Sequence, residues 1–267
     1  MRIGLLLSLP AVLAAAQPAV REMSLVTPDG FTVKGTLTVP AQAGRRPVVI
    51  LAHQFGYDRT GWKPLAEDLN ARGIATLALD LRGHGQSTRK GDATVAVTTD
   101  FAASSAAVRF DLIPGDLAQA AQWVRKQPRI DGRRVGLAGA SIGAYSALVA
   151  APGVRPVAVL ALSPGGGWGE KPEARMVRAV EQAKASVFVA AAEGDPIALA
   201  NAQALKGVFG VYARIRPGKE HGFAYLPELT ETLGGWFGEV LGRHPVAVPS
   251  KAAPLQVPAE DPKAQPQ

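Results

Sequence analysis

The run G-A-S-I-G at residues 139–143 places Ser141 between two glycines, each two positions away. A serine on a sharp turn between a strand and a helix exposes its hydroxyl, and small neighbours let the two elements approach closely. Residues 133–138 favour a strand, and residues 141–150 favour a helix of small residues. Because the chain has 29 glycines among 267 residues, the motif can also arise by chance, so the other catalytic groups decide its meaning.

A serine hydroxyl is a poor nucleophile without an adjacent base, and the chain has four histidines to choose from. His221 lies in the stretch RPGKEHGFAY, in a loop between the last predicted strand and the last predicted helix. Such a loop reaches the carboxyl edge of a sheet, where open α/β folds hold their sites. Asp195, just beyond a predicted strand, is the expected carboxylate partner of the histidine, and Glu193 is its competitor. The order Ser141, Asp195, His221 suits a nucleophile, an acid and a base on such a fold.

Segments of strand and helix character alternate along the chain and form the scaffold for these residues. The predicted strands are 48–52, 74–79, 135–138, 157–162, 186–191 and 208–215. The predicted helices are 62–72, 117–126, 141–150, 173–185 and 229–241. Apolar strands that alternate with amphipathic helices predict an α/β fold with a mostly parallel central sheet and helices on both faces. An antiparallel hairpin around Pro28-Asp29-Gly30 is expected to precede this sheet.

The composition divides the chain into three parts. Residues 1–16 have a short basic start and an apolar run that ends in three alanines, which predicts a cleaved secretory signal and a secreted or periplasmic protein. A buried N-terminal helix is the alternative interpretation, and the run is too short for a stable membrane anchor. Residues 17–243 form the predicted globular domain. Residues 244–267, which are rich in proline and include His244, form a predicted disordered tail.

Charge and composition exclude several classes of site. The chain has no cysteine, which excludes disulfides, thiolate metal sites and a cysteine nucleophile. The formal net charge is +7, but the basic residues are scattered without interleaved aromatic residues, so we interpret them as a solvated surface and expect no nucleic-acid binding. No second group of His, Asp and Glu has the spacing of metal ligands, so we predict neither a metal nor a cofactor.

Two further motifs accompany the serine, aspartate and histidine. The stretch LAHQFGYDRTGW at residues 51–62 is similar to a strand-end loop that helps to build an oxyanion hole, and DLRGHGQS at residues 80–87 matches D-x-R-G-x-G-x-S. With these motifs, residues 48–241 resemble the α/β-hydrolase superfamily, in which G-x-S-x-G forms the nucleophile elbow. The nearest subgroup resembles small single-domain hydrolases of the dienelactone-hydrolase and serine-esterase type.

The resemblance implies roles for residues around the serine. The backbone N–H groups of Ile142 and Phe55 would form the oxyanion hole. Gln54 stands where the family usually has glycine, which restricts the backbone of the loop and makes Gln54 the alternative donor to Phe55. Three residues receive structural roles: His53 orders the oxyanion loop, Arg82 hydrogen-bonds backbone carbonyls near its turn, and His84 holds that turn in place.

The resemblance also sets expectations for the surroundings of the site. Residues 163–185 are too few for a large cap domain, so the site is open unless residues 87–115 fold over it. That segment is longer than a usual connection, and we expect it to carry a short helix or a lid. Trp168 and Tyr57 are interpreted as packed aromatic residues, although each could line the substrate pocket.

The expected activity is that of a secreted serine hydrolase that cleaves a carboxylic ester, lactone or thioester of a small molecule through an acyl-serine intermediate. A dienelactone hydrolase proper uses cysteine, which this chain lacks, so its substrate is not carried over. Two alternatives stay open. One is a peptidase or amidase that uses the same triad, and the other is a catalytically silent secreted binding protein with this fold.

Overall fold

The computed structural model describes residues 17–168 and 171–242 of the chain. The predicted signal (1–16) and the predicted tail (244–267) lie outside the described residues. The strands are β1 (Ala19–Val26), β2 (Phe31–Val39), β3 (Arg46–Ala52), β4 (Ala75–Asp80), β5 (Arg89–Lys90), β6 (Ala93–Thr94), β7 (Ile130–Ala140), β8 (Ala158–Leu162), β9 (Ser186–Ala192) and β10 (Val211–Arg216). The α-helices are α1 (Lys63–Ala71), α2 (Phe101–Val108), α3 (Ile113–Arg125), α4 (Ile142–Val154), α5 (Pro172–Ala183), α6 (Pro196–Leu205) and α7 (Leu226–Gly242). Short 3-10 helices are η1 (Arg59–Trp62), η2 (Phe110–Leu112) and η3 (Gly222–Tyr225).

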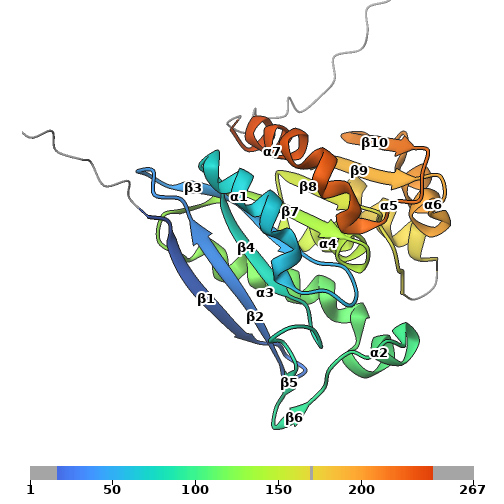
Figure 1. Cartoon of the computed structure of the whole chain (residues 1–267), viewed down its shortest axis with the longest axis horizontal. Helices are drawn as coiled ribbons and strands as arrows, with labels where there is room; N and C mark the ends of the chain where they lie inside the picture. Colours follow the sequence, from blue (N-terminus) through green and yellow to red (C-terminus); the bar gives the residue numbers. More distant parts are fainter. Residues whose placement is uncertain (1–16, 169–170, 243–267) are drawn as a thin grey trace, which may run out of the picture.

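The strands form one sheet in the order β10-β9-β8-β7-β3-β4-β2-β5-β6, and β1 pairs with β2 (Figure 1). All neighbours from β10 to β4 run parallel, whereas β2 is antiparallel to both β4 and β1. The prediction of a mostly parallel sheet with an N-terminal antiparallel hairpin is therefore confirmed. The parallel strands end at one edge of the sheet, which brings the residues that follow β3, β7, β8, β9 and β10 together.

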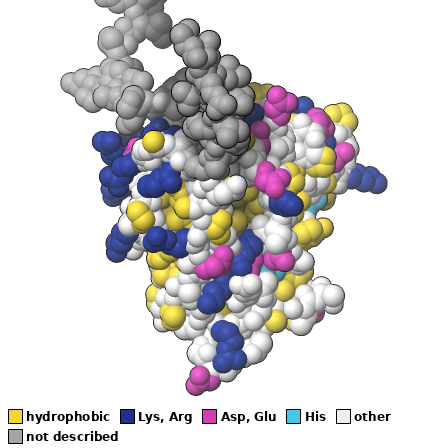
Figure 2. Space-filling view, turned by 60° about the vertical axis from the view of Figure 1, so that its left-hand side comes forward, with side chains coloured by type: hydrophobic (Ala, Val, Ile, Leu, Met, Phe, Trp, Pro, Cys, Tyr) yellow, Lys and Arg dark blue, Asp and Glu magenta, His cyan; other side chains and the backbone are white. Residues whose placement is uncertain are grey.

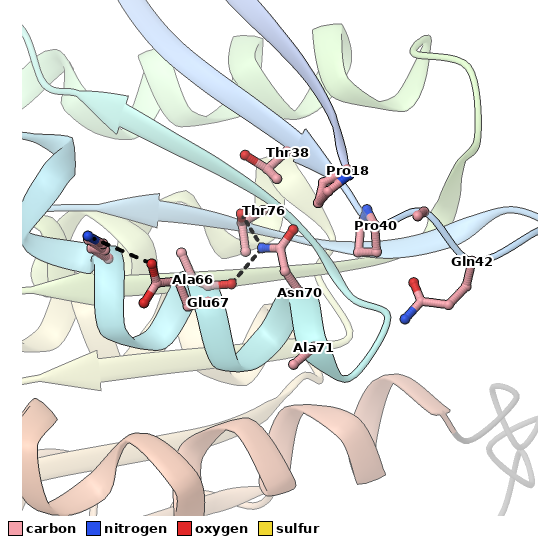
Figure 3. Close-up of a pocket in the computed structure, with 11 residues that line it drawn as sticks. Pro18, Thr38, Pro40, Gln42, Ala66, Glu67, Asn70, Ala71 and Thr76 are labelled. Atoms are coloured by element: carbon pink, nitrogen blue, oxygen red, sulfur yellow. Dashed lines mark hydrogen bonds and ion pairs between the residues drawn. The ribbon is translucent and has the colours of Figure 1, made fainter. Parts of the chain in front are cut away.

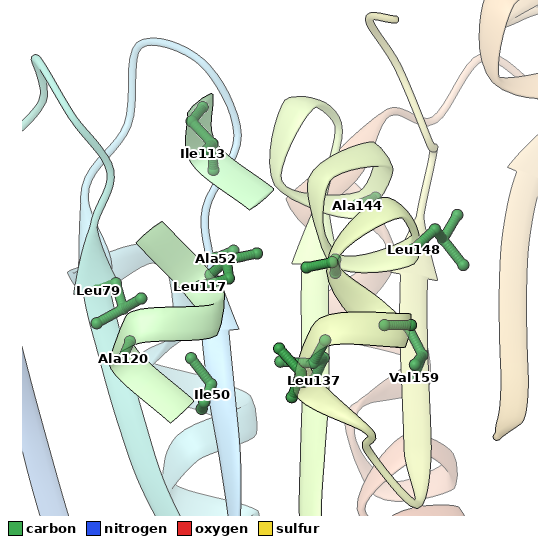
Figure 4. Packing of buried hydrophobic residues seen from close by; sticks show 14 of the residues in the cluster. Ile50, Ala52, Leu79, Ile113, Leu117, Ala120, Leu137, Ala144, Leu148 and Val159 are labelled. Carbon is green, nitrogen blue, oxygen red and sulfur yellow. The ribbon is translucent and has the colours of Figure 1, made fainter. Parts of the chain in front are cut away.

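Both faces of the central parallel strands β3, β4, β8 and β9 are buried, which explains why these strands lack alternating polarity. Ile50 of β3 and Leu137 of β7 pack under α3 and α4, where Leu117 and Leu148 meet them (Figure 4). The alternate strand positions face the opposite layer, in which α1 and α7 supply residues such as Leu65. Successive side chains of a strand point to opposite faces, so a strand between two helical layers must be apolar at every position.

One helix agrees with a sequence expectation and one was not expected. Residues 87–115 carry a two-strand hairpin and α2, so the predicted short helix is present in that segment. Helix α6 (PIALANAQAL) was not predicted. It consists mostly of alanine and other apolar residues, so it has no polar face to give the spacing of an amphipathic helix. The residues of α6 that face the sheet are mostly small. The available sequence signal for this helix was therefore Asp195-Pro196, which is typical of a helix N-terminus.

The predicted role of Arg82 is largely wrong. Its guanidinium is buried and binds two carboxylates rather than a set of carbonyls: Nε and Nη2 donate to Asp116 at 2.7 and 2.8 Å, and Nη1 and Nη2 donate to Asp29 at 3.1 and 3.2 Å. Only one carbonyl, that of Val108, accepts from it, at 3.0 Å. Both carboxylates lie far from Arg82 in sequence, so no local pattern signalled the pairing. Arg82 thereby joins the β1–β2 turn, the end of α2 and the start of α3.

Charged side chains are spread over the molecular surface. On the face drawn in Figure 2, Lys and Arg lie among Asp and Glu without forming a continuous basic patch. This distribution fits the interpretation of a solvated basic surface, and the expectation of no nucleic-acid binding stays a prediction.

We predict that D116A destabilises the protein by about 3 kcal/mol, because it leaves the buried Arg82 guanidinium without its main partner. The Asp116 side chain is 5% exposed, whereas that of Asp29 is 28% exposed, so D29A is expected to cost about 1 kcal/mol or less. Urea unfolding of the two variants measures the difference. Equal losses of unfolding free energy in the two variants would contradict the prediction that Arg82 depends more on the buried Asp116 than on Asp29.

Candidate active site

Ser141 occupies a strained turn between β7 and α4. Its backbone angles are φ +52° and ψ −116°. Residues other than glycine rarely adopt this combination, which costs about 1–3 kcal/mol. Three backbone hydrogen bonds hold the turn. Ser141 N–H donates to Leu162 O at 2.9 Å, and Ser141 O accepts from Tyr145 N–H at 3.1 Å and from Gly165 N–H at 3.2 Å. Strain of this kind marks sites at which the fold holds one side chain in a fixed direction.

The two glycines of the motif are required by packing. A Cβ on Gly139 would collide with the backbone of Gly143, and a Cβ on Gly143 would collide with the carbonyls of Ala52 and His53. The first turn of α4 therefore packs directly against the end of β3. This contact brings the N–H of Ile142 next to the loop that follows β3.

His221 and Asp195 are brought together by neighbouring strands. Gly194 N–H donates to Gly218 O at 2.8 Å, which ties the loop after β9 to the loop after β10. His221 Nδ1 lies 2.6 Å from Asp195 Oδ2, with side chains 44% and 12% exposed. A carboxylate only accepts hydrogen bonds, so Nδ1 carries the proton and Nε2 is left as the acceptor. Glu193, the competing acid, is exposed and makes no such contact.

Ser141 and His221 face the same point. Ser141 Oγ lies 3.1 Å and His221 Cε1 lies 3.6 Å from the position that a Cβ on Gly165 would occupy. No hydrogen bond joins Ser141 Oγ to His221 Nε2 among the described residues. Such bonds are often long before a substrate is bound, so the arrangement remains suited to proton transfer.

Backbone N–H groups are available for a developing oxyanion. Among the described residues, the N–H groups of Ile142, Gln54 and Phe55 have no hydrogen-bond acceptor. Ile142 is the first residue of α4, and the N–H groups of a first helical turn have no partner within the helix. The geometry thus leaves both predicted donors, and the alternative Gln54, free to bind an oxygen.

The histidines near β3 and β4 are buried and make structural contacts. His53 Nε2 accepts from Leu81 N–H at 2.9 Å, and His53 Nδ1 lies 2.7 Å from Gln54 O. Burial, with a smaller contribution from His84, lowers the pKa of His53 to about 3. His84 Nδ1 lies 3.0 Å from Arg82 O, and burial lowers its pKa as well. Both imidazoles are neutral near pH 7, and both contacts agree with the loop-ordering roles expected from the sequence.

Aromatic side chains gather beside the loop after β3. Phe55 has ring-centroid distances of 5.1 Å to Phe101 of α2 and 5.9 Å to Phe110 of η2. Trp168 Nε1 donates to Ser105 Oγ of α2 at 3.0 Å, which joins the segment 87–115 to the loop after β8. Trp168 is packed against its neighbours, as expected. Tyr57 is 52% exposed but contacts the ring of Phe223 edge-on at a centroid distance of 5.5 Å, so it is only partly packed.

Two side chains that support the site were not identified from the sequence. Ser163 Oγ accepts from Gly222 N–H at 3.0 Å, and Gln54 Oε1 accepts from Phe223 N–H at 2.8 Å. Ser163 directly follows a predicted strand at the carboxyl edge, and this position was an available signal. The bond from Gln54 joins residues 169 positions apart and has no local signature.

A groove of about 540 Å³ lies elsewhere, between α1 and the end of β2 (Figure 3). Thr38, Pro40, Ala66 and Asn70 help to line it. The groove lies toward the edge at which the parallel strands begin, and its lining contains no serine or histidine. It is therefore not a candidate for the chemistry of Ser141. The described residues also contain no group of three or more His, Cys, Asp or Glu that could hold a metal ion.

Comparisons with known proteins identify the fold. A model of the alpha/beta hydrolase family matches residues 39–265. A dienelactone hydrolase of Anabaena variabilis superposes with a TM-score of 0.59 at 23% identity, over 85% of this chain and 98% of that chain. An esterase of Pyrococcus furiosus superposes with a TM-score of 0.63 at 19% identity, over 85% and 93%. A cold-adapted esterase from an Arctic intertidal metagenomic library reaches 0.63 at 21% identity, over 83% and 93%.

This chain matches only part of the length of its curated relatives. A Mycobacterium tuberculosis protein that is named as a phosphoribosyl transferase is 32% identical over 160 residues, which are 58% of this chain and 32% of that protein. The chain thus spans about a third of the length of the curated relatives it matches.

The buried histidines lead to a prediction for pH. His53 has a pKa of about 3 when folded and an ordinary value near 6.5 when unfolded, so between these values only the unfolded state takes up its proton. The contribution of His53 to the free energy of unfolding is therefore fully present well above pH 6.5 and is lost as the pH falls from there toward 3. We predict that H53N makes the slope of unfolding free energy against pH shallower by up to about 1.4 kcal/mol per pH unit near pH 5. Urea unfolding between pH 5 and 7 tests this, and equal slopes in both proteins would contradict it.

Proposed function

Because this chain belongs to the alpha/beta hydrolase family, we propose that it is a serine hydrolase that cleaves a carboxylic ester, lactone or thioester through an acyl-serine intermediate. The strongest support is the position of Ser141 Oγ and His221 Cε1 around one point beside Gly165, while His221 Nδ1 contacts Asp195. A nucleophile, a base and the acid that orients the base thereby surround a single space.

In the proposed reaction, Ser141 Oγ bonds to the carbonyl carbon while its proton passes to His221 Nε2. Asp195 holds the imidazole with Nε2 toward the serine and stabilises the imidazolium. The tetrahedral intermediate then expels the alcohol or thiol, which takes the proton from His221. Water attacks the acyl-serine with His221 again as the base, and release of the acid restores the Ser141 hydroxyl.

The oxyanion of this intermediate would bind Ile142 N–H and the N–H of Phe55 or Gln54, which have no acceptors among the residues that the structure describes. Each such donor contributes about 3 kcal/mol to lowering the barrier. Gly143, the residue after Ile142, packs against the backbone of Ala52 and His53 at the end of β3, so the two proposed donor segments are neighbours.

The surroundings of Ser141 favour a neutral, apolar acyl group. The side chains of Trp168 and Ile142 both lie within 4 Å of the position that a Cβ on Gly166 would occupy. Phe55 and Phe101 continue this aromatic surface toward α2. Among the described residues, no hydrogen bond or ion pair joins a Lys or Arg side chain to Ser141 or His221.

We predict that S141A lowers kcat/KM for short p-nitrophenyl acyl esters at least a thousandfold, roughly the loss expected for a nucleophile that acts with a base. It should also abolish labelling by a fluorophosphonate. The matched control is S146A, which removes a buried serine one turn further along α4. S146A is expected to keep both activities, because its hydroxyl does not reach the reacting atoms.

The same assay separates the alternatives. Hydrolysis of aminoacyl amides in preference to esters would indicate a peptidase or amidase on this triad. A wild-type protein that neither hydrolyses activated esters nor reacts with the fluorophosphonate would be a binding protein with this fold. Full activity of S141A would exclude Ser141 as the nucleophile.

We further propose that the enzyme acts in the periplasm or outside the cell, on the strength of the signal-like residues 1–16. None of the described helices is long and apolar enough to cross a bilayer. Expressed with its full N-terminus in a secreting bacterial host, the exported protein is expected to begin at Gln17, as measured by N-terminal sequencing. Retention of residues 1–16 on a cytosolic product would contradict the proposal.

A further inference from the structure

We infer that the side chain of Gln54 is a positioning residue for His221. Its Oε1 accepts the backbone N–H of Phe223, two residues beyond the histidine, at 2.8 Å. The inference rests on the proposed function, because it assigns Gln54 a task in a reaction for which His221 is the base. It concerns the side chain of Gln54 and is independent of which backbone N–H binds the oxyanion.

His221 requires such support because little else holds it. Its side chain is 44% exposed, and within residues 17–168 and 171–242 its one side-chain hydrogen bond is to Asp195. The next two N–H groups begin η3 and have no partners within that short helix. Instead they donate to two side chains in succession, Gly222 to the buried Ser163 Oγ and Phe223 to Gln54 Oε1. The backbone that carries the imidazole is thus fixed by Ser163 on one side and Gln54 on the other.

The loop is shaped to receive Gln54. Gly222 has φ +55°, and a Cβ at this position would collide with Gln54 Oε1. The carbonyl of Gln54 also lies 2.7 Å from His53 Nδ1 and accepts from Tyr57 N–H at 3.3 Å. Gln54 is therefore anchored at its backbone by a buried histidine and reaches the loop of His221 with its side chain.

This bond joins the two halves of the proposed site. The loop after β3 carries the candidate oxyanion donors, and the loop after β10 carries the base. A glycine at position 54, which the resemblance leads one to expect, has no side chain to connect them. Phe223 also packs against Trp62 at a centroid distance of 4.9 Å, so losing the hydrogen bond should displace the loop slightly and not unfold it.

The test is the pair Q54M and Q54E. Methionine fills a similar volume but cannot accept the Phe223 N–H, whereas glutamate can. We expect Q54M to lower kcat for a p-nitrophenyl ester by roughly ten- to a hundredfold, as for a base displaced by up to about 1 Å, with KM within about twofold. Q54E should recover kcat to within about threefold at high pH, because a charged acceptor binds an N–H at least as well.

The pH profile distinguishes positioning from general stability. A carboxylate at position 54 favours the imidazolium of His221, so Q54E should move the acid limb of kcat/KM to higher pH, while Q54M should leave the limb in place. Q203M, on the exposed side of α6, is the matched control and should behave as the wild type. Unchanged kcat in Q54M, or a loss that Q54E does not recover, would overturn the inference.

Amide hydrogen exchange keeps the inference separate from the proposed function. The Phe223 N–H should exchange faster in Q54M than in the wild type and remain protected in Q54E, whether or not any ester is hydrolysed. Equal protection in Q54M and wild type would disprove the anchoring contact. If the wild type hydrolyses no ester but Phe223 protection depends on Gln54, the proposed function fails while the contact stands.

Discussion

The close contact between the first turn of α4 and the end of β3 is the constraint on which the site depends. Only glycine at 139 and 143 allows it, and it forces Ser141 into a backbone conformation that a serine rarely adopts. The fold offsets this strain with backbone hydrogen bonds to Leu162 and Gly165 in the adjacent strand and loop. One packing arrangement therefore directs the serine side chain and places Ile142 N–H beside the loop after β3.

The remaining groups reach Ser141 from strands further along the sheet. Parallel pairing of β9 with β10 aligns the loops that carry Asp195 and His221, but β8 separates these strands from β7. The histidine therefore crosses the sheet edge on a loop, where the backbone bond from Gly194 to Gly218 is supplemented by side chains of neighbouring segments. Ser163, directly after β8, and Gln54, in the loop after β3, accept the two N–H groups that follow His221.

Hydrophobic periodicity and short motifs predict the structural features that are determined by residues close together in the sequence. The parallel sheet, the N-terminal hairpin and the turn at Ser141 all have local patterns, and the choice of Asp195 over Glu193 follows from its position beyond the strand end. Interactions between distant segments have no such pattern. Arg82 pairs with acids 34 and 53 residues away, and Gln54 bonds to a residue 169 positions away, so only the folded chain reveals these partners.

The motifs specify a reaction, whereas segments outside them shape the space that a substrate would enter. Helix α2 and the loop after β8 contribute Phe101 and Trp168 to the aromatic group that includes Phe55, and a hydrogen bond from Trp168 to Ser105 joins them. Neither segment carries a catalytic motif. Arg82 binds both the start of α3 and the end of α2, so the turn of the D-x-R-G-x-G-x-S motif also holds the helix that carries Phe101. Changes of substrate preference in this fold can therefore arise in α2 while Arg82 and the triad stay the same.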